Sequence, residues 1–309
     1  MTSYHHAPFG YDCPFCRVVA GENLPDLGTQ QQDVVYHNRL ATAFVANKWW
    51  PNNRGHVLIV PNQHLENLYE MPSDAAAAIH QAARLVSLAM KETYLCDGIS
   101  TRQHNEPGGL QEVWHYHLHV FPRYHGDNLY GLDGFLSQLE DRVDYAEKIR
   151  GWIGHHRDSA IIRPLRSDDA APWDLWLLAD PSRDLVERYV NRGSSFVAEL
   201  DGHIIGTSVL IETRPETAEL VNLAVAEAYQ GLGLGRRLVE HAMATARSWG
   251  FRTMEVGTGN SSLAQLGLYQ QCGFRIVGVD LDFFTRHYPE PIYEHGLWCR
   301  DMIRLSAHL

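Results

Sequence analysis

Residues 113–123 read Val-Trp-His-Tyr-His-Leu-His-Val-Phe-Pro-Arg, a run in which three histidines alternate with aromatic or apolar side chains. Alternation of this kind predicts a β-strand over 113–121, because residues at i, i+2 and i+4 of a strand share one face. On that strand the imidazoles of His115, His117 and His119 project together. Three imidazoles on one face serve either a metal ion or an acid–base and nucleophile cluster. The alternative is a half-buried strand whose histidines have no function.

The segments before and after this run predict a small unit of strands and helices. An alanine-rich helix is expected over 74–95, with Ser73 as its N-cap. A second, charged helical segment covers 132–152. Short β-type runs bounded by turn residues lie at 34–36, 42–45, 55–61 and 99–104.

The histidine run resembles the signature of the histidine-triad (HIT) family, His-φ-His-φ-His-φ-φ with φ apolar. The stretch 55–61, Gly-His-Val-Leu-Ile-Val-Pro, and His64 match an earlier strand and loop of that family, so the resemblance covers roughly residues 11–130. It implies an antiparallel sheet with helices, and a nucleotide or nucleotide conjugate as substrate. In the family the middle histidine, here His117, attacks an α-phosphate and forms a covalent nucleotidyl-histidine.

The same resemblance implies further nucleotide contacts. His119 and His56 would bind or polarise the phosphate, and Asn105 would line the phosphate site. Asn47 lies nearest to the place of the family's ribose-binding acid. One departure is Glu112, which follows Gln111 where the family usually has Ser or Thr. Its carboxylate would repel a phosphate unless it points away.

Two cysteines spaced Cys13-Pro-Phe-Cys16 indicate metal binding or redox chemistry rather than a disulfide framework. Some bacterial HIT proteins, and the related galactose-1-phosphate uridylyltransferases, hold a structural zinc ion through such a pair, a later histidine and the first triad histidine. The resemblance implies the ligands Cys13, Cys16, His64 and His115, a closed tetrahedral site. The alternative is two buried free thiols.

In the second half of the chain, residues 230–235 read Gln-Gly-Leu-Gly-Leu-Gly, between a strand and a long helix. Consecutive backbone amides at a helix N-terminus form an anion site, and glycines allow a pyrophosphate to approach the chain. A dinucleotide-binding turn is the competitor. The surrounding pattern predicts a mixed α/β sheet with interleaved helices, with strands over 160–165, 196–200, 203–211, 218–225, 253–257, 274–281 and 301–305 and helices over 233–249 and 262–271.

This pattern is similar to that of the GNAT acetyltransferases over residues 160–306, through the Gln-x-x-Gly-x-Gly loop and the later run from Asn260 to Phe274. In that family the loop binds the pyrophosphate of acetyl-CoA and the preceding strand pairs with its pantetheine arm. The implied acetyl-CoA contacts are Leu223, Ala224, Val225, Gln230, Gly231, Leu232, Gly233, Leu234, Gly235, Asn260 and Tyr269.

The GNAT resemblance also implies the chemistry of acetyl transfer. Tyr269 would protonate the departing CoA thiolate, with a buried packing tyrosine as the alternative. Glu255 lies in a stretch similar to the ribosomal-protein alanine acetyltransferase branch, where a glutamate helps to deprotonate the amine. Glu219 is the competing base. The aromatic stretch 282–289 suits a small amine or a peptide N-terminus as acceptor.

Length and charge limit the other classes of function. The 309 residues suit two domains, which we place at 1–145 and 159–309 with a linker at 146–158. A net charge of −11 without a basic cluster argues against a nucleic acid partner. Apolar runs are too short to span a membrane, and we see no signal peptide, so a cytoplasmic protein is expected. The HIT resemblance also implies a homodimer, since proteins of that family often pair through their sheets.

The sequence therefore predicts a bifunctional enzyme, a nucleotidyl hydrolase or transferase joined to an acetyl-CoA-dependent N-acetyltransferase. The alternative is an acetyltransferase whose HIT module only senses nucleotides or carries a structural zinc ion.

Overall fold

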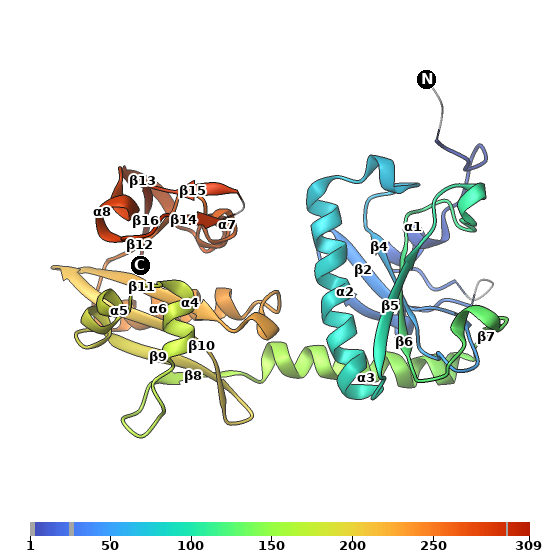
Figure 1. The fold of residues 1–309 in the computed structure, drawn as a ribbon, viewed down its shortest axis with the longest axis horizontal. Coiled ribbons are helices and arrows are strands. Elements are labelled where there is room, and N and C mark those ends of the chain that lie inside the picture. Colours follow the sequence, from blue (N-terminus) through green and yellow to red (C-terminus); the bar gives the residue numbers. More distant parts are fainter. Residues whose placement is uncertain (1–3, 25–27, 295) are drawn as a thin grey trace. The chain divides into compact units, whose positions relative to one another are not determined.

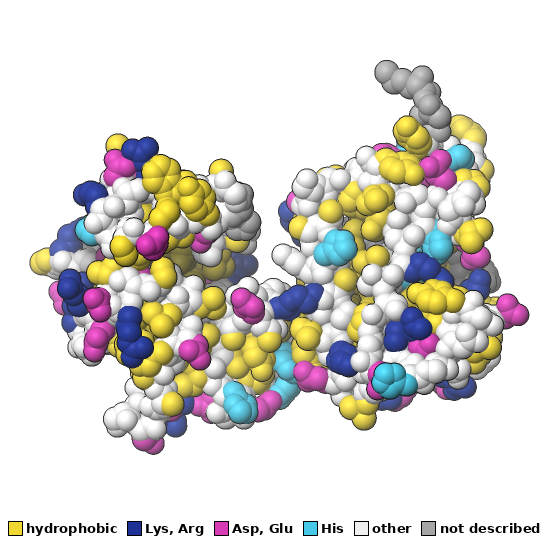
Figure 2. Space-filling view, in the orientation of Figure 1, with side chains coloured by type: hydrophobic (Ala, Val, Ile, Leu, Met, Phe, Trp, Pro, Cys, Tyr) yellow, Lys and Arg dark blue, Asp and Glu magenta, His cyan; other side chains and the backbone are white. Residues whose placement is uncertain are grey.

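The computed structural model describes residues 4–24, 28–294 and 296–309 (Figure 1). The chain divides into two compact units, one ending at His155 and the other beginning at His156. The boundary falls inside helix α3 (Leu139–Asp158), which contains the expected linker 146–158. Among the described residues, no helix combines the length and the apolar character needed to cross a membrane. On the face drawn in Figure 2, acidic and basic side chains are interspersed over both units.

The first unit is built on a five-stranded antiparallel sheet in the order β1-β2-β4-β6-β5. Its strands are β1 (Val34–His37), β2 (Ala41–Val45), β4 (Val57–Pro61), β5 (Gly98–Gln103) and β6 (Leu118–Arg123). Two short strands, β3 (Lys48–Trp49) and β7 (Phe135–Leu136), pair beside it. Short 3-10 turns connect these elements: η2 (Gln31–Asp33), η3 (Leu68–Glu70), η4 (Pro107–Gly109) and η5 (Leu129–Gly131).

Helices pack on both faces of this sheet. Helix α2 (Ser73–Thr93) contacts β2, β4 and β6, and its apolar residues at helical spacing, such as Ile79 and Val86, are fully buried. The short helix α1 (Pro14–Val19) packs against alternate residues of β2 and β4, including Phe44 and Val60. The alternation of the strands thus separates two apolar layers.

The predicted strand over 113–121 is wrong in its first half, because β6 begins only at Leu118. Residues 113–117 form a loop in which the amide of Tyr116 donates to the carbonyl of Leu65 at 2.6 Å. The Tyr116 amide thus bonds to the loop after β4 and not to a strand of the sheet. The three histidines therefore do not share one strand face, and only His119 lies in β6.

The second unit has a seven-stranded mixed sheet in the order β13-β16-β12-β11-β10-β9-β8. Among the strand pairings that the structure describes in this sheet, only that of β11 with β12 is parallel. The strands are β8 (Ile161–Pro164), β9 (Ser194–Leu200), β10 (His203–Arg214), β11 (Thr217–Val225), β12 (Thr253–Gly259), β13 (Arg275–Asp280) and β16 (Met302–His308). The antiparallel sheet of the first unit and this mixed sheet confirm the expected fold classes.

Helices again bracket the sheet of the second unit. Helix α6 (Leu234–Ser248) buries Leu238, Val239 and Ala242 against β10 and β11. On the other face, Trp176 of α4 packs with Val209 of β10. The remaining elements are α4 (Trp173–Ala179), α5 (Arg183–Val190), η6 (Glu227–Tyr229), α7 (Leu263–Gln271), α8 (Phe283–His287), β14 (Ile292–Glu294) and β15 (Leu297–Cys299).

Candidate functional site

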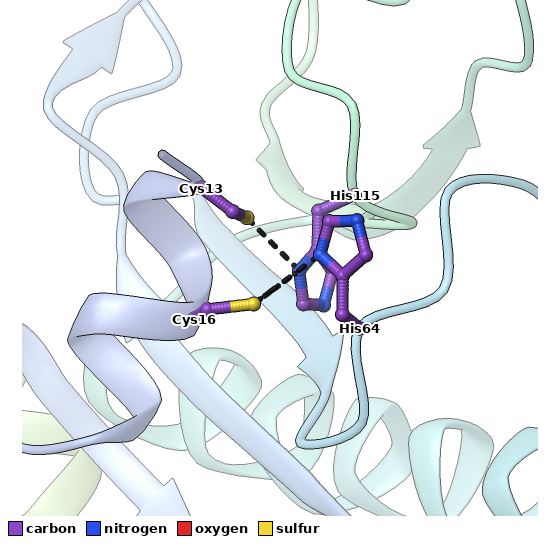
Figure 3. A group of neighbouring side chains, drawn as sticks. All are labelled: Cys13, Cys16, His64 and His115. Atoms are coloured by element: carbon purple, nitrogen blue, oxygen red, sulfur yellow. Dashed lines mark hydrogen bonds between the residues drawn. The ribbon is translucent and has the colours of Figure 1, made fainter. Parts of the chain in front are cut away.

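Four expected metal ligands from three distant segments meet beside α1 (Figure 3). The ligand atoms of Cys13, Cys16, His64 and His115 all lie within 4.8 Å of one another. Nδ1 of His115 is 3.2 Å from Sγ of Cys13, and Nδ1 of His64 is 3.2 Å from Sγ of Cys16. Tetrahedral zinc bonds of ~2.3 Å to sulfur and ~2.0 Å to nitrogen separate such atoms by about 3.5 Å, so the four residues fit a zinc ion.

Surrounding groups prepare His115 as a ligand. Its Nε2–H donates to the carbonyl of Pro61 at 3.0 Å, which fixes the ring and turns Nδ1 toward the thiols. Burial lowers the pKa of His115 to about 4, so the ring is neutral near pH 7. Burial and the neighbouring Cys13 raise the pKa of Cys16 to about 12. A bound cation would stabilise the two thiolates against burial and against the repulsion between their negative charges.

His117 lies on the loop just before β6 and is 5% exposed. Its Nδ1–H donates to the carbonyl of His115 at 2.7 Å. This bond selects the tautomer whose Nε2 carries a free lone pair. Burial lowers the pKa of His117, which keeps the ring unprotonated at neutral pH.

His119 and His56 form a neutral pair beside His117. Nδ1 of His119 is 3.3 Å from Nε2 of His56, and the His117 and His119 ring centroids are 5.0 Å apart. The rings of His56 and Phe121 are stacked 4.5 Å apart. Burial lowers the pKa of His56 to about 3 and that of His119 well below its ordinary value. The structure therefore brings the three predicted phosphate-site histidines together, His117 from the loop before β6, His56 from the position just before β4, and His119 from β6 itself.

The acidic residue at the unusual position has its own partner. The carboxylate of Glu112 lies 3.5 Å from Nζ of Lys48, and the Glu112 side chain is 76% exposed. Its charge is thus compensated at the surface.

The two predicted asparagine contacts lie in structured loops. Asn105 accepts from the Leu68 amide at 2.8 Å and donates to Gln103 at 2.8 Å. Asn47 follows β2, and its carbonyl accepts from the Ser137 amide at 2.8 Å. Their contact with a nucleotide stays a prediction.

Sequence reasoning missed two residues beside the triad. Arg102 is the register partner of His119 on β5, and the His104 ring centroid is 5.9 Å from that of His119. A basic residue two positions before a histidine, on the strand next to the triad, was the available signal. The sequence alone does not show that β5 pairs with β6, so it could not place these two residues beside the triad.

In the second unit, the glycine-rich loop 230–235 leads directly into α6. Gly231 and Gly233 both have φ of +83°, a conformation that residues with a Cβ rarely adopt. Gly233 is the N-cap residue of α6, while Leu232 and Leu234 are buried anchors on either side of it. Backbone amides at the start of this 15-residue helix form an anion site.

Strands β11 and β12 diverge beside this loop. Their parallel pairing ends at Leu220 and Val256, although β11 continues to Val225. The register between β10 and β11 also shifts there, so Val221 forms a bulge. Among the described strands, none pairs with residues 221–225 on the β12 side. This free backbone edge contains the predicted contacts Leu223, Ala224 and Val225.

The predicted acid and bases of acetyl transfer lie in the same unit. Tyr269 of α7 is 5% exposed and packs against Phe274, and burial raises its pKa, which keeps the hydroxyl protonated. Glu219 and Glu255 are register partners on β11 and β12. Burial, followed by the neighbouring Glu255, raises the pKa of Glu219, although Arg304 lies 3.2 Å away. The Glu255 carboxylate is ion-paired with Arg214.

The side chain of Asn260, a further predicted acetyl-CoA contact, forms hydrogen bonds to the backbone just before β16. Its Oδ1 accepts from the amides of Arg300 and Asp301 at 2.8 and 2.9 Å. Its side-chain amide donates to the Trp298 carbonyl at 3.0 Å. A role for Asn260 toward acetyl-CoA stays a prediction.

Comparison with known proteins identifies a protein family for each half of the chain. Residues 28–126 match the HIT domain family, and residues 162–274 match the acetyltransferase (GNAT) family. An uncharacterized N-acetyltransferase of Bacillus subtilis, YvbK, is 53% identical over 44% of this chain and 88% of its own length. An uncharacterized HIT-like protein of Methanocaldococcus jannaschii is 34% identical over 37% of this chain and 81% of its own length.

Among solved structures, a GNAT family acetyltransferase from Elizabethkingia anophelis with acetyl-CoA bound is 42% identical, with a TM-score of 0.49. That match covers 49% of this chain and 99% of the other. The chain belongs to both families, with a HIT domain followed by a GNAT acetyltransferase domain.

Proposed function

We propose that the chain is a bifunctional enzyme. Its HIT domain cleaves a nucleotide conjugate through a nucleotidyl-His117 intermediate, and its GNAT domain transfers an acetyl group from acetyl-CoA to an amine. The observation that carries the first activity is the 2.7 Å hydrogen bond from Nδ1 of His117 to the His115 carbonyl, which leaves Nε2 as the nucleophile.

Two displacements at one phosphorus complete the nucleotidyl reaction. First, Nε2 of His117 forms a bond to the α-phosphorus while the bond to the leaving group breaks. The electron pair of that bond departs on the leaving atom, which takes up a proton from solvent when it is an amine nitrogen. Water then attacks the same phosphorus and the P–N bond breaks, which gives a nucleoside monophosphate, free His117 and one proton. His119 and His56 contribute hydrogen bonds to the phosphate oxygens.

The four-residue cluster of Cys13, Cys16, His64 and His115 would hold zinc with a closed ligand set, so the metal would supply structural rigidity rather than a reactive position. His115 then has two functions. Its ring joins the loop to α1, and its carbonyl orients His117.

For acetyl transfer, the loop 230–235 binds the pyrophosphate of acetyl-CoA and the free edge of β11 pairs with its pantetheine arm. The amine nitrogen attacks the acetyl carbonyl after losing a proton to the Glu219–Glu255 pair. The C–S bond breaks and Tyr269 gives its proton to the CoA thiolate, while the nitrogen loses its second proton, which restores the Tyr269 hydroxyl. The similarity to YvbK, an uncharacterized N-acetyltransferase of Bacillus subtilis, supports an amine acceptor.

A panel experiment tests both activities. The full chain is incubated with adenosine 5′-phosphoramidates of several amines plus acetyl-CoA, and nucleotide release and acetylated amines are measured by mass spectrometry. We expect AMP and acetylated amine from the wild type, no AMP from His117→Ala, and little acetylated amine from Tyr269→Phe. Nucleotide binding without turnover in the wild type would instead show a HIT module that only senses nucleotides.

A further inference from the structure

Arg102 is a cation beside the triad for which the described residues provide no acceptor. Its guanidinium lies over the rings of Trp50 and Phe121, at 5.3 and 5.0 Å from their centroids. Its buried Nε has no hydrogen-bond partner, and no described carboxylate lies within ion-pair distance of it. Burial lowers the pKa of Arg102, and the more distant Tyr130 and Glu112 only partly oppose that shift. Neutral His56 and His119 are close enough for the charge of Arg102 to lower their pKa values further.

Packing alone does not explain an arginine at this position. A buried donor without an acceptor is destabilising, and a partly desolvated cation is more so. Stacking on aromatic rings partly compensates this unfavourable free energy and holds the guanidinium in one plane. The arrangement is therefore preorganised for an anion that the described residues do not themselves supply.

Pairwise ring contacts connect Arg102 to the histidines of the site. His117 is followed by His119 at 5.0 Å between ring centroids, and His119 lies 5.4 Å from His56. Phe121 comes next, 4.5 Å from His56, and the Arg102 guanidinium lies over it. In an in-line displacement, the leaving group departs on the side of phosphorus opposite the nucleophile. Arg102 is the cross-strand partner of His119 and lies over Phe121, so its guanidinium is on the side of His119 that faces away from His117 along β6.

We propose that Arg102 binds an anionic, oxyanion-type leaving group, the phosphate or sulfate joined to the α-phosphate that His117 attacks. This inference rests on the proposed function and names its substrate class. When the P–O bond breaks, the electron pair stays on the bridging oxygen of the leaving group, and Arg102 neutralises that charge without a proton transfer. An amine leaving group needs a proton instead, which a guanidinium does not supply.

The test compares leaving groups on one nucleoside. Wild type, Arg102→Gln and Arg102→Lys are assayed with ADP, adenosine 5′-phosphosulfate and adenosine 5′-phosphoramidate. We expect Arg102→Gln to lower kcat/KM about 10- to 100-fold for the leaving groups that are oxyanions and less than about threefold for the phosphoramidate. Arg102→Lys should restore part of the loss. A loss for only one of phosphate and sulfate identifies which of the two the residue binds.

The matched control is Arg54→Gln, which removes another guanidinium stacked on an aromatic ring, that of Phe135 at 5.9 Å. It should leave all three rates unchanged. Equal losses for the three substrates in Arg102→Gln, or no loss for any, would overturn the inference.

A binding experiment separates this inference from the proposed function. His117→Ala protein, with and without Arg102→Gln, is titrated with AMP and ADP by calorimetry. We expect ADP to bind at least about tenfold more tightly than AMP, and Arg102→Gln to remove the difference. Equal binding of AMP and ADP overturns the role of Arg102 alone. Absence of binding by both, together with an inactive wild type, overturns the proposed function and this inference with it.

Discussion

At the residue scale, the alternating histidines differ in the partner of one ring nitrogen. His115 uses Nε2–H for the Pro61 carbonyl and turns Nδ1 to the thiols, whereas His117 uses Nδ1–H for the His115 carbonyl and keeps Nε2 free. In our proposal, these different partners give His115 the role of a metal ligand and His117 the role of a nucleophile. The alternation along the sequence indicated the cluster, but the tautomers depend on carbonyls that only the fold brings into range.

The proposed zinc site gives a prediction about single cysteines. Cys13→Ser removes a thiolate from a closed four-ligand set, so the bound zinc should fall from about one equivalent to near zero, with a lower Tm. Cys96→Ser is the matched control, since Cys96 is a buried thiol outside the cluster. Metal analysis and thermal unfolding measure both. Full zinc content in Cys13→Ser would contradict the proposed ligand set.

The two glutamates of the GNAT domain make a second residue-scale prediction. Glu219 has the raised pKa, so it is the better base near neutral pH, and Glu219→Gln should lower kcat of acetyl transfer about 100-fold. Because the charge of Glu255 contributes to that raised pKa, Glu255→Gln should move the acid limb of the pH–rate profile to lower pH. Measured pH–rate profiles of acetyl transfer by both variants test these two expectations. Full activity of Glu219→Gln would leave Glu255 as the base.

At the element scale, strand pairing explains what could and could not be predicted. Helix α2 and the helix after the glycine-rich loop followed from apolar spacing and glycine positions. The start of β6 at Leu118 did not, because the Tyr116 amide bonds to Leu65, far away in the sequence. The proximity of Glu219 to Glu255 and of Arg102 to His119 depends on cross-strand register, which a single sequence does not contain.

A buried ion pair connects elements of the first unit and predicts a large stability effect. Arg142 of α3, 3% exposed, donates to Asp33 of η2, 0% exposed, at 2.9 Å. Burial raises the pKa of Asp33 despite this partner, so the pair depends on being complete. Arg142→Met leaves a buried carboxylate and should lower the free energy of unfolding of this unit by about 3–5 kcal/mol.

The control is Lys148→Met, which breaks an exposed pair with Asp144 at 2.7 Å and should cost less than about 1 kcal/mol. Urea unfolding of the full chain, followed by a signal from the first unit, measures both. Similar losses in the two variants would contradict the importance assigned to the buried pair.

The neutral pair of His56, just before β4, and His119 of β6 predicts acid sensitivity. His56 has a folded pKa of about 3, below its unfolded value near 6.5, and that of His119 is also lowered. Below about pH 6.5 the unfolded chain binds protons that the folded chain does not, so stability falls as pH falls toward 3, by up to ~1.4 kcal/mol per pH unit for each group. His56→Gln should reduce this slope in urea unfolding across pH 4–7. An unchanged slope would show that His56 is already protonated in the folded protein.

At the whole-molecule scale, each unit contains its own sheet, core and candidate site residues. The HIT residues lie before the boundary at His155, and the GNAT residues lie after it. We therefore expect His117→Ala to leave acetyl transfer within about twofold of wild type, and Tyr269→Phe to leave nucleotide release unchanged. Loss of both activities in either variant would show that the two sites depend on each other.

The central claim is a covalent nucleotide on His117, and trapping it is the most direct measurement. The full chain is mixed with adenosine 5′-phosphoramidate, quenched rapidly, and analysed by intact-protein and peptide mass spectrometry under conditions that preserve phosphoramidates. The account predicts a mass increase of one adenylyl group, located on the imidazole of His117 and missing in His117→Ala. Turnover with the adduct on His119 or His56, or with none formed during steady-state cleavage, would contradict it.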